Sequence, residues 1–254
     1  MKQSTRPVRK WSLLTLALVC LNLFIPDIST AKKSPVKPVA AASENPVSAH
    51  GTWYLMAAAS YERLNLGQLG LSHEAFNLAI EGMERLQQAG RIANDRIISI
   101  VDFSLPSSQK RLFIIDLEAQ RILFRTYVAH GQRSGTVYAK MFSNKPESHQ
   151  SSPGFYLTAG TYNGGNGYSM QLVGLDKGIN DKAFQRAIVM HGAPYVHEGL
   201  VKSQGYIGRS HGCPAVSEKL NKPIIETIKN GSVLFIYPGN RDYARKSTVL
   251  NGKV

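Results

Sequence analysis

The feature that most constrains this fold is a series of short hydrophobic runs that begins after Asp95. Branched and aromatic residues dominate the runs, and turn residues such as Pro106-Ser107-Ser108 separate them. Such side chains pack well on a pleated surface, so the runs predict β-strands. Many short strands with little helical alternation favour an antiparallel sandwich or barrel-like sheet over a doubly wound fold. The expected strands are 96–103, 111–117, 121–130, 155–159, 169–173, 187–191 and 233–237.

A helical pattern precedes the strands, in residues 51–92. Ser72 can cap a helix that ends at Gly90, and apolar residues recur at helical spacing between these two positions. They are Phe76, Ile80, Met83 and Leu86. We expect a small N-terminal helical cap whose apolar stripe belongs to the core rather than to a binding groove. The predicted fold class is therefore mainly β, with short helices and this helical segment in front.

Turn and cap signals also occur between the strands. The glycine-rich run 163–167 lacks the Gly-Lys-Ser/Thr ending of a phosphate-binding loop, so we expect a loop or hairpin turn there. Two short helices are predicted because each follows a possible cap residue, namely 181–185 after Asn180 and 218–229 after Ser217. Together the strands and these helices define one sizeable domain, 93–240, followed by a C-terminal tail, 241–254.

Residues 1–31 have the pattern of a secretory signal peptide. Basic residues precede the apolar run 13–25, and cleavage is plausible after Ala31. The run is short for a membrane span, although an uncleaved membrane anchor remains an alternative. Residues 32–50 are rich in Pro, Ala, Ser and Lys and contain no aromatic residue, which predicts a flexible linker. We therefore expect an exported protein, in the periplasm, the cell wall or the extracellular space.

The net charge of the chain indicates which kinds of partner it could bind. The chain has 30 Lys and Arg against 17 Asp and Glu, a formal net charge of +13. A basic exported protein tends to associate with anionic polymers or membrane surfaces, while export argues against nucleic acid. The alternative is that the charge only keeps the protein soluble.

The chain has two cysteines, Cys20 in the expected signal peptide and Cys213. After cleavage only Cys213 would remain, so no internal disulfide could form even in an oxidising compartment. An unpaired thiol in that setting suggests a reactive role, and the alternative is an inert buried cysteine.

The surroundings of Cys213 favour the reactive role. A thiol is a useful nucleophile only as thiolate, which requires an imidazole or a positive field close by. His191, His211 and Arg209 are candidates for both. Gly212 lets the backbone turn sharply, so that amide N–H groups beside the thiol could converge on an oxyanion formed at an attacked carbonyl.

These residues resemble the catalytic domain of the L,D-transpeptidases of bacterial cell walls. The match consists of His191-Gly192 followed, after a loop, by Ser-His-Gly-Cys at 210–213. The run Gly-Arg-Ser-His-Gly-Cys-Pro-Ala at 208–215 is similar to the branch called murein L,D-transpeptidase catalytic domain family proteins. The resemblance extends through 142–144, 151–154 and 174–176, and covers about 130–238. Ala215 departs from the wider family, which often has Arg or Asn there, and this puts contacts from that side chain in doubt.

The resemblance implies a β-sandwich or barrel fold and a reaction without a metal or other cofactor. Members attack the bond between the L-centre of a diaminopimelate and the following D-alanine of a peptidoglycan stem, form a thioester and pass it to a second stem or to water. Cys213 would be the nucleophile and His191 the base, its tautomer held by the main-chain carbonyl of Gly192. His211 is the rival base, and otherwise shapes the pocket or binds substrate.

Secondary candidates have ordinary alternatives. Arg209 could hold a stem carboxylate, or be a surface arginine or pair with an acidic neighbour. Tyr195 and Ser210 could contact substrate, and Tyr195 could equally be packing. Gly212 and Gly192 are the backbone positions expected near the oxyanion. We interpret His130 as an ordinary strand-end histidine, although it resembles a position near the cleft.

Three rival functions stay open. The histidines and Cys213 could bind zinc in a metallopeptidase, although no His-Glu-x-x-His motif is present. The chain could be a non-catalytic module that binds the cell wall through its basic surface. It could also be a different Cys-His hydrolase, which would share the nucleophile and the base.

Overall fold

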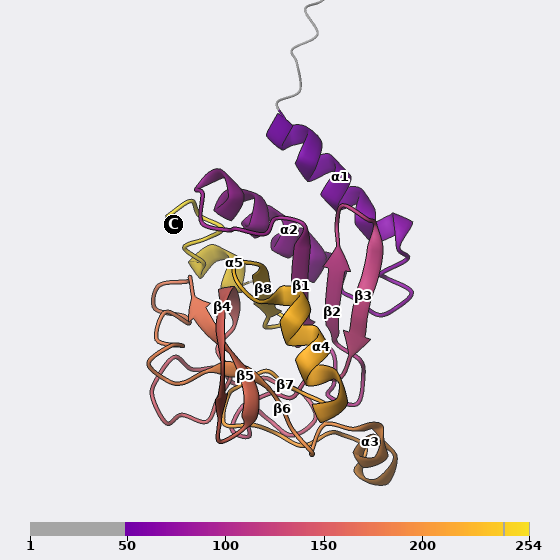
Figure 1. Cartoon of the computed structure of the whole chain (residues 1–254), viewed down its shortest axis with the longest axis vertical. Coiled ribbons are helices and arrows are strands. Elements are labelled where there is room, and N and C mark those ends of the chain that lie inside the picture. Colours follow the sequence, from indigo (N-terminus) through magenta and orange to yellow (C-terminus); the bar gives the residue numbers. More distant parts are fainter. Residues whose placement is uncertain (1–48, 241, 254) are drawn as a thin grey trace, which may run out of the picture. The chain divides into compact units, whose positions relative to one another are not determined.

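The computed structural model describes residues 49–240 and 242–253, and their centre is one eight-stranded sheet. The strand order is β3-β2-β1-β8-β4-β5-β6-β7 (Figure 1). The expected signal peptide and nearly all of the linker lie outside the described residues. The strands are β1 (Ile97–Asp102), β2 (Leu112–Asp116), β3 (Arg121–Thr126), β4 (Gly154–Gly164), β5 (Gly167–Gly174), β6 (Val189–Gly192), β7 (Ala215–Val216) and β8 (Val233–Tyr237).

The sheet curls around a helix, α4 (Glu218–Ile228). This helix packs against β1 and also against β5 and β6, which lie far from β1 in the strand order. A flat sheet could not bring these strands to one helix, so the sheet is barrel-like. The predicted fold class, mainly β with short helices, is confirmed.

The expectation of a wholly antiparallel sheet is wrong at two places. β1 pairs with β8 in parallel, and β6 pairs with β7 in parallel. Parallel neighbours need a long connection, and each of these pairs has one: α3 (Glu198–Gln204) lies between β6 and β7. Most of the remaining expected strands match, and Gly164 pairs with Gly167 to close the predicted hairpin turn.

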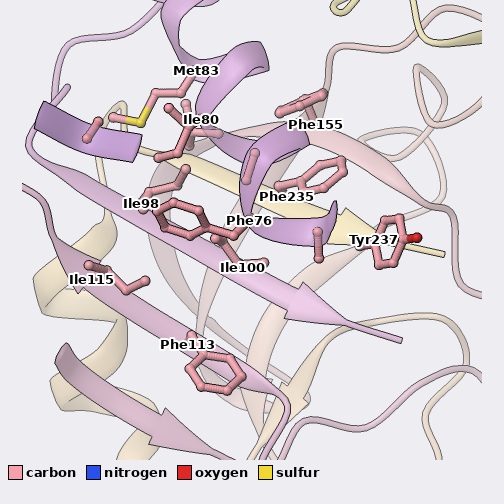
Figure 2. Close-up of a cluster of buried hydrophobic side chains, with 14 of the residues drawn as sticks. Phe76, Ile80, Met83, Ile98, Ile100, Phe113, Ile115, Phe155, Phe235 and Tyr237 are labelled. Atoms are coloured by element: carbon pink, nitrogen blue, oxygen red, sulfur yellow. The ribbon is translucent and has the colours of Figure 1, made fainter. Parts of the chain in front are cut away.

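Two helices precede the sheet, α1 (Ala49–Arg63) and α2 (His73–Gln88). Ser72 caps α2 as predicted, because its hydroxyl accepts a hydrogen bond from the Ala75 N–H at 3.3 Å. The predicted apolar stripe of α2 is fully buried against one face of the sheet, where it meets Ile98, Ile100 and Phe235 (Figure 2). Burial of each such side chain contributes about 1.5–3 kcal/mol, so the stripe belongs to the core as expected. None of the helices in the described residues is long and apolar enough to cross a membrane.

The opposite face of the sheet packs on α4. Ile97 and Val101 of β1 join a second core cluster with Ile224, Ile225 and Ile228, whereas Ile98 and Ile100 belong to the first. β1 is therefore buried on both faces, which explains its uninterrupted run of apolar residues. Cys213 lies in this second cluster, so the packing around α4 also positions the thiol.

The predicted helix 181–185 is wrong, because the chain forms turns there. Asn180 does not cap a helix. Its side-chain oxygen accepts from the Asp176 N–H at 2.9 Å, and its amide nitrogen donates to the carbonyls of Pro153 and Phe155. These bonds hold the segment against the start of β4, and they compete with helix formation.

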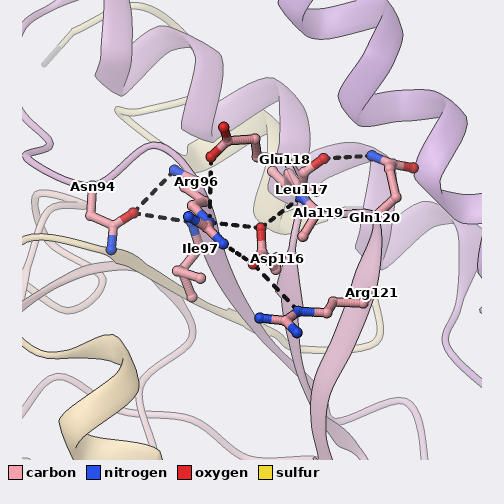
Figure 3. Close-up of polar contacts among 9 residues, drawn as sticks. All are labelled: Asn94, Arg96, Ile97, Asp116, Leu117, Glu118, Ala119, Gln120 and Arg121. Carbon is pink, nitrogen blue, oxygen red and sulfur yellow. Dashed lines mark hydrogen bonds and ion pairs between the residues drawn. The ribbon is translucent and has the colours of Figure 1, made fainter.

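Asp116 organises the turn between β2 and β3 (Figure 3). Arg96 donates two hydrogen bonds to its carboxylate, at 2.9 and 2.7 Å, and the Ala119 N–H donates a third. The bonds from Arg96 hold the pKa of Asp116 below its usual range. Gln120, at the end of the turn, donates to the Ser60 hydroxyl at 2.8 Å and so links α1 to the sheet.

The last described residues, 242–253, pack against the domain rather than leave it. They contain α5 (Asp242–Lys246), whose Tyr243 is buried. The hydroxyls of Tyr243 and Ser247 each donate to the buried carboxylate of Asp176 at 2.6 Å, and the Phe155 N–H donates to it at 3.0 Å. One acidic residue thereby joins β4 to the C-terminal segment.

Candidate active site

The candidate residues gather where β6 and β7 lie side by side. The parallel pairing places His191 opposite Ala215. Cys213 precedes β7 by two residues and lies next to Val189 of β6. Side chains two residues apart on a strand point to the same face. The register therefore brings Cys213 and His191 to one end of one pair of strands.

The sulfur of Cys213 contacts main-chain groups near the start of β6. Its sulfur donates a hydrogen bond to the Ala187 carbonyl at 3.7 Å, and the residue is 9% exposed. Burial raises the pKa of the thiol, while the Val189 N–H and the charge of Arg186 act in the opposite direction. The sulfur forms no hydrogen bond with any histidine of the described residues. Cys213 is thus nearly buried, and its sulfur is held by a main-chain carbonyl rather than by a base.

His191 is held in one tautomer. Its Nδ1 lies 2.8 Å from the Gly192 carbonyl oxygen. Because a carbonyl only accepts, Nδ1 carries a proton, and in the neutral form of the ring Nε2 then keeps its lone pair. Burial lowers the pKa of His191, which the bond to Gly192 partly offsets. The structure thus contains the hydrogen bond that the resemblance implied.

His211 is turned toward a different segment. Its exposed ring stacks on His149, with centroids 4.3 Å apart and an interplanar angle of 5°. His149 in turn contacts the side-chain amide of Gln132 at 2.9 Å. The two candidate bases thus have different neighbours: His191 bonds to the Gly192 carbonyl, whereas His211 packs on the 143–152 segment.

Ser210 braces the turn that carries the thiol. Its hydroxyl accepts from the Gly212 N–H at 3.0 Å and donates to the Cys213 carbonyl at 2.7 Å. The amide of Gly212 is therefore already engaged, and Gly192 contributes a carbonyl rather than an N–H to the site. Among the described residues, the N–H groups of His211 and Cys213 have no acceptor. These two amides are better placed to donate to an oxyanion than the two glycines named from the sequence.

Gly212 is required by the conformation of this turn. Its φ is +124°, a region that side chains rarely adopt. A Cβ at this position would lie 2.7 Å from the carbonyl oxygen of Gln150. The turn of residues 210–213 can approach the 143–152 segment this closely only because residue 212 is glycine.

Tyr195 and Arg209 flank the turn in different ways. Burial raises the pKa of Tyr195 to about 12, and the negative charge of a Cys213 thiolate adds to this effect, so the phenol lies within electrostatic range of the sulfur. Its hydroxyl has no hydrogen-bond partner among the described residues. Arg209 donates from one nitrogen to the carbonyls of Gln132 and Gly135, at 3.4 and 3.3 Å, and has no acidic partner in the same part of the chain.

His130 is a structural residue in this arrangement. It is fully buried, its Nδ1 lies 2.7 Å from the guanidinium of Arg111, and its Nε2 lies 3.0 Å from the Gly135 carbonyl. Since arginine only donates, Nδ1 accepts and Nε2–H donates. Burial, with a further contribution from Arg111, lowers the pKa of His130 to about 4.

A small groove opens beside the thiol. It has a volume of about 100 Å³ and includes Ala187 and Val189, the two residues whose backbones contact the sulfur. Phe184 and Tyr162 stand at its rim, and both are substantially exposed. Cys213 itself is not among the residues that line this groove.

No group of three or more His, Cys, Asp or Glu side chains within the described residues is arranged to hold a metal ion. The zinc-dependent alternative therefore gains no ligand set from this part of the chain.

Comparison with known protein families decides the family. The family model described as L,D-transpeptidase catalytic domain matches residues 68–237. The chain belongs to this family. The matched region of this L,D-transpeptidase-family chain includes α2, the whole sheet and the catalytic turn.

Solved structures of L,D-transpeptidases are among its structural neighbours. The enzyme from Mycobacterium smegmatis is 13% identical, with a TM-score of 0.35, and the match covers 56% of this chain and 58% of that one. The enzyme from Stackebrandtia nassauensis is 15% identical, with a TM-score of 0.34, and covers 72% and 78%. This chain thus spans little more than half of the Mycobacterium protein. Identities and TM-scores this low support no transfer of residue roles. A search of the curated proteins found no match to this chain.

One residue near the thiol was missed by sequence reasoning. Arg186 lies just before Ala187, and its guanidinium donates four hydrogen bonds to the 143–152 segment. The acceptors are the Ser143 carbonyl at 2.7 Å, the Ser152 hydroxyl at 2.5 Å, the Ser148 hydroxyl at 3.1 Å and the Gln150 carbonyl at 2.8 Å. No local motif marks this arginine, because its partners lie more than thirty residues away in the chain.

Proposed function

We propose that this member of the family is a cysteine-dependent L,D-transpeptidase that acts on peptidoglycan stem peptides through a thioester acyl-enzyme. The observation that supports the proposal is the hydrogen bond between His191 Nδ1 and the Gly192 carbonyl, in a strand pair whose register brings His191 and Cys213 to the same end. Family membership supplies the reaction class. The acceptor is either a second stem, which gives a cross-link, or water, which trims the stem.

The first step is activation of the thiol. Rotation about one side-chain bond moves Sγ from the Ala187 carbonyl toward Nε2 of His191, which takes its proton. Hydrogen bonds between nucleophile and base are often absent in a free enzyme and form when substrate binds. The groove that includes Ala187 and Val189 is the proposed place for part of the incoming peptide.

The second step is acyl transfer to sulfur. The thiolate attacks the carbonyl at the L-centre of the stem, an S–C bond forms, and the carbonyl oxygen becomes an oxyanion near the N–H groups of His211 and Cys213. Collapse of this intermediate breaks the C–N bond, and the His191 imidazolium donates its proton to the departing amine of D-alanine. Attack by a second amine or by water then releases the acyl group.

Tyr195 and Arg209 are proposed substrate contacts, and Ser210 supports the turn rather than the substrate. The Tyr195 hydroxyl and the remaining guanidinium donors of Arg209 are free to bind polar groups of the stem. The net charge of +13 favours association with anionic wall polymer. We further propose that residues 1–31 direct export to the compartment where peptidoglycan lies.

The test is intact-mass analysis of the protein after incubation with purified stem tetrapeptides. We expect wild type to gain the mass of the stem without D-alanine and to release D-alanine, and Cys213→Ala to do neither. His191→Asn should slow acylation by about 10²–10⁴-fold, and His211→Asn should slow it far less. A wild-type protein that forms no adduct and releases no D-alanine would refute the proposal, and the reverse order of the two histidine variants would reassign the base.

The same experiment separates the rival functions. A module that only binds wall material would leave stems intact in both wild type and Cys213→Ala. A zinc peptidase would lose turnover in a chelator and regain it with zinc, whereas the thiol mechanism is indifferent to both. A different Cys-His hydrolase would prefer a bond at another centre of the stem.

A further inference from the structure

Arg186 has no part in the mechanism proposed above, although it lies next to the thiol. We propose that Arg186 is a positioning residue that fixes the 143–152 segment against the catalytic turn and presents a fixed positive charge to Cys213. This inference rests on the proposed role of Cys213 as a nucleophile.

All four hydrogen bonds of Arg186 go to the 143–152 segment. Two acceptors are main-chain carbonyls and two are serine hydroxyls, and no carboxylate of the described residues pairs with this guanidinium. The planar fork of arginine suits such a set of acceptors, which a lysine could not satisfy together. Because both terminal nitrogens already donate within the protein, the charge of Arg186 is not available as a clamp for a substrate carboxylate.

The same side chain touches the catalytic turn. One guanidinium nitrogen lies 3.4 Å from the position that a Cβ on Gly212 would occupy, and the Gln150 carbonyl to which that nitrogen donates lies 2.7 Å from it. The Ser151 hydroxyl donates to the Gly212 carbonyl at 3.4 Å. The residue before Cys213 is therefore packed between the guanidinium and the segment that the guanidinium holds.

The main chain of the residue after Arg186 also contacts the sulfur of Cys213. The next residue, Ala187, has a φ of +53°, which few residues other than glycine adopt, and its carbonyl accepts the hydrogen bond from Cys213. The bend at Ala187 is thus fixed on one side by the anchored side chain of Arg186. It places both a cation and a thiol acceptor at Cys213.

The charge has a direct consequence for the thiol. Burial raises the pKa of Cys213, and Arg186 is the cation that opposes this effect. Arg186 is half-buried, so water and salt screen its charge less than a surface charge. A positive charge near the sulfur stabilises the thiolate relative to the thiol. The thiolate is the form that attacks a carbonyl.

The test is the pH dependence of Cys213 alkylation by iodoacetamide, a neutral reagent that reacts with the thiolate. Wild type, Arg186→Lys, Arg186→Met and Arg186→Gln are compared in the absence of any substrate. We expect the midpoint of the pH profile to rise by about one unit in the two neutral variants, with alkylation about tenfold slower at pH 7.5. Arg186→Lys keeps the charge and should stay close to wild type in midpoint.

Lys182→Met is the matched control. Lys182 is exposed on the same turn segment, and only its main-chain N–H bonds to Asn144, so the variant removes one positive charge without touching the anchored network. Its midpoint should equal that of wild type. Should Arg186→Met fail to fold, Arg186→Gln carries the comparison, since its amide retains two donors for the 143–152 segment.

Two results would overturn the inference. One is an unchanged midpoint in the neutral variants, and the other is an equal rise in Arg186→Lys and Arg186→Met, which would mean that the charge plays no part. The measurement uses free protein and a small reagent, so it stands apart from turnover. Failure of stem-peptide acylation with a normal Arg186 effect would refute the proposed function alone.

Discussion

Acidification should destabilise this domain through His130. In the folded state the ring is fully buried, accepts a hydrogen bond from Arg111 and donates one to Gly135. A proton added to Nδ1 would remove the acceptor and place a second positive charge beside the guanidinium. The folded-state pKa of His130 is accordingly lowered to about 4, first by burial and then by Arg111.

The size of the effect follows from linkage. An unfolded histidine titrates near 6.5, so between this value and about 4 the unfolded chain binds the extra proton and the folded protein does not. The stability that depends on neutral His130 is fully present above pH 6.5 and is lost as the pH falls toward 4. Between pH 7.5 and pH 5 the loss amounts to about 2 kcal/mol, which corresponds to a fall in Tm of roughly 4–8 °C.

Urea denaturation at pH 7.5 and pH 5 measures this loss in wild type and in His130→Gln, whose amide can accept and donate but does not titrate. We expect the free energy of unfolding of the variant to fall by about 2 kcal/mol less than that of wild type over this interval. His197→Gln, at an exposed position, serves as the control and should follow wild type. Equal pH dependence in wild type and His130→Gln would refute the assignment of a neutral buried His130.

Three further substitutions probe the catalytic turn and its support. Gly212→Ala adds a Cβ in a left-handed conformation against the Gln150 carbonyl, and should lower the free energy of unfolding by about 2 kcal/mol and slow Cys213 alkylation, as thermal melts and reaction rates would show. Ser210→Ala leaves the Gly212 N–H and the Cys213 carbonyl unpaired and should cost about 1–3 kcal/mol in urea denaturation. Asp176→Asn turns an acceptor of several N–H and O–H groups into a partial donor and should cost about 3 kcal/mol, and a melt unchanged from wild type would contradict its role in joining β4 to the C-terminal segment.

Local sequence patterns predict most of the helices and strands of this fold. Strands with alternating or continuous apolar residues and the capped helix α2 depend on neighbours in the sequence, so their spacing predicts them. The parallel pairs β1–β8 and β6–β7 depend on partners far away in the chain, and no periodicity reports a partner. The false helix at 181–185 has the same origin, because Asn180 bonds to Pro153 and Phe155 instead of to its own turn.

The candidate site divides in a similar way. The signature 208–215 gives the nucleophile candidate, and the His-Gly pair at 191–192 gives a base candidate whose hydrogen bond needs only the next residue. The sequence does not show that Ser210 binds the Gly212 N–H, because this bond depends on the conformation of the turn. Arg186 was missed because its role arises from contacts with the 143–152 segment, which only the fold brings close.

The His-Gly pairs at 130–131 and 211–212 pack against the same stretch of backbone. A Cβ on Gly131 would lie 2.5 Å from the His149 carbonyl, and one on Gly212 would lie 2.7 Å from the Gln150 carbonyl. The backbone of residues 149–151 is thus packed between two glycines that are distant in the sequence. Any side chain at either position would push this backbone away from the turn of Cys213, and with it the acceptors that hold Arg186. Glycine at 131 therefore belongs to the chemistry of the site, although it lies far from the thiol in the sequence and carries no reactive group.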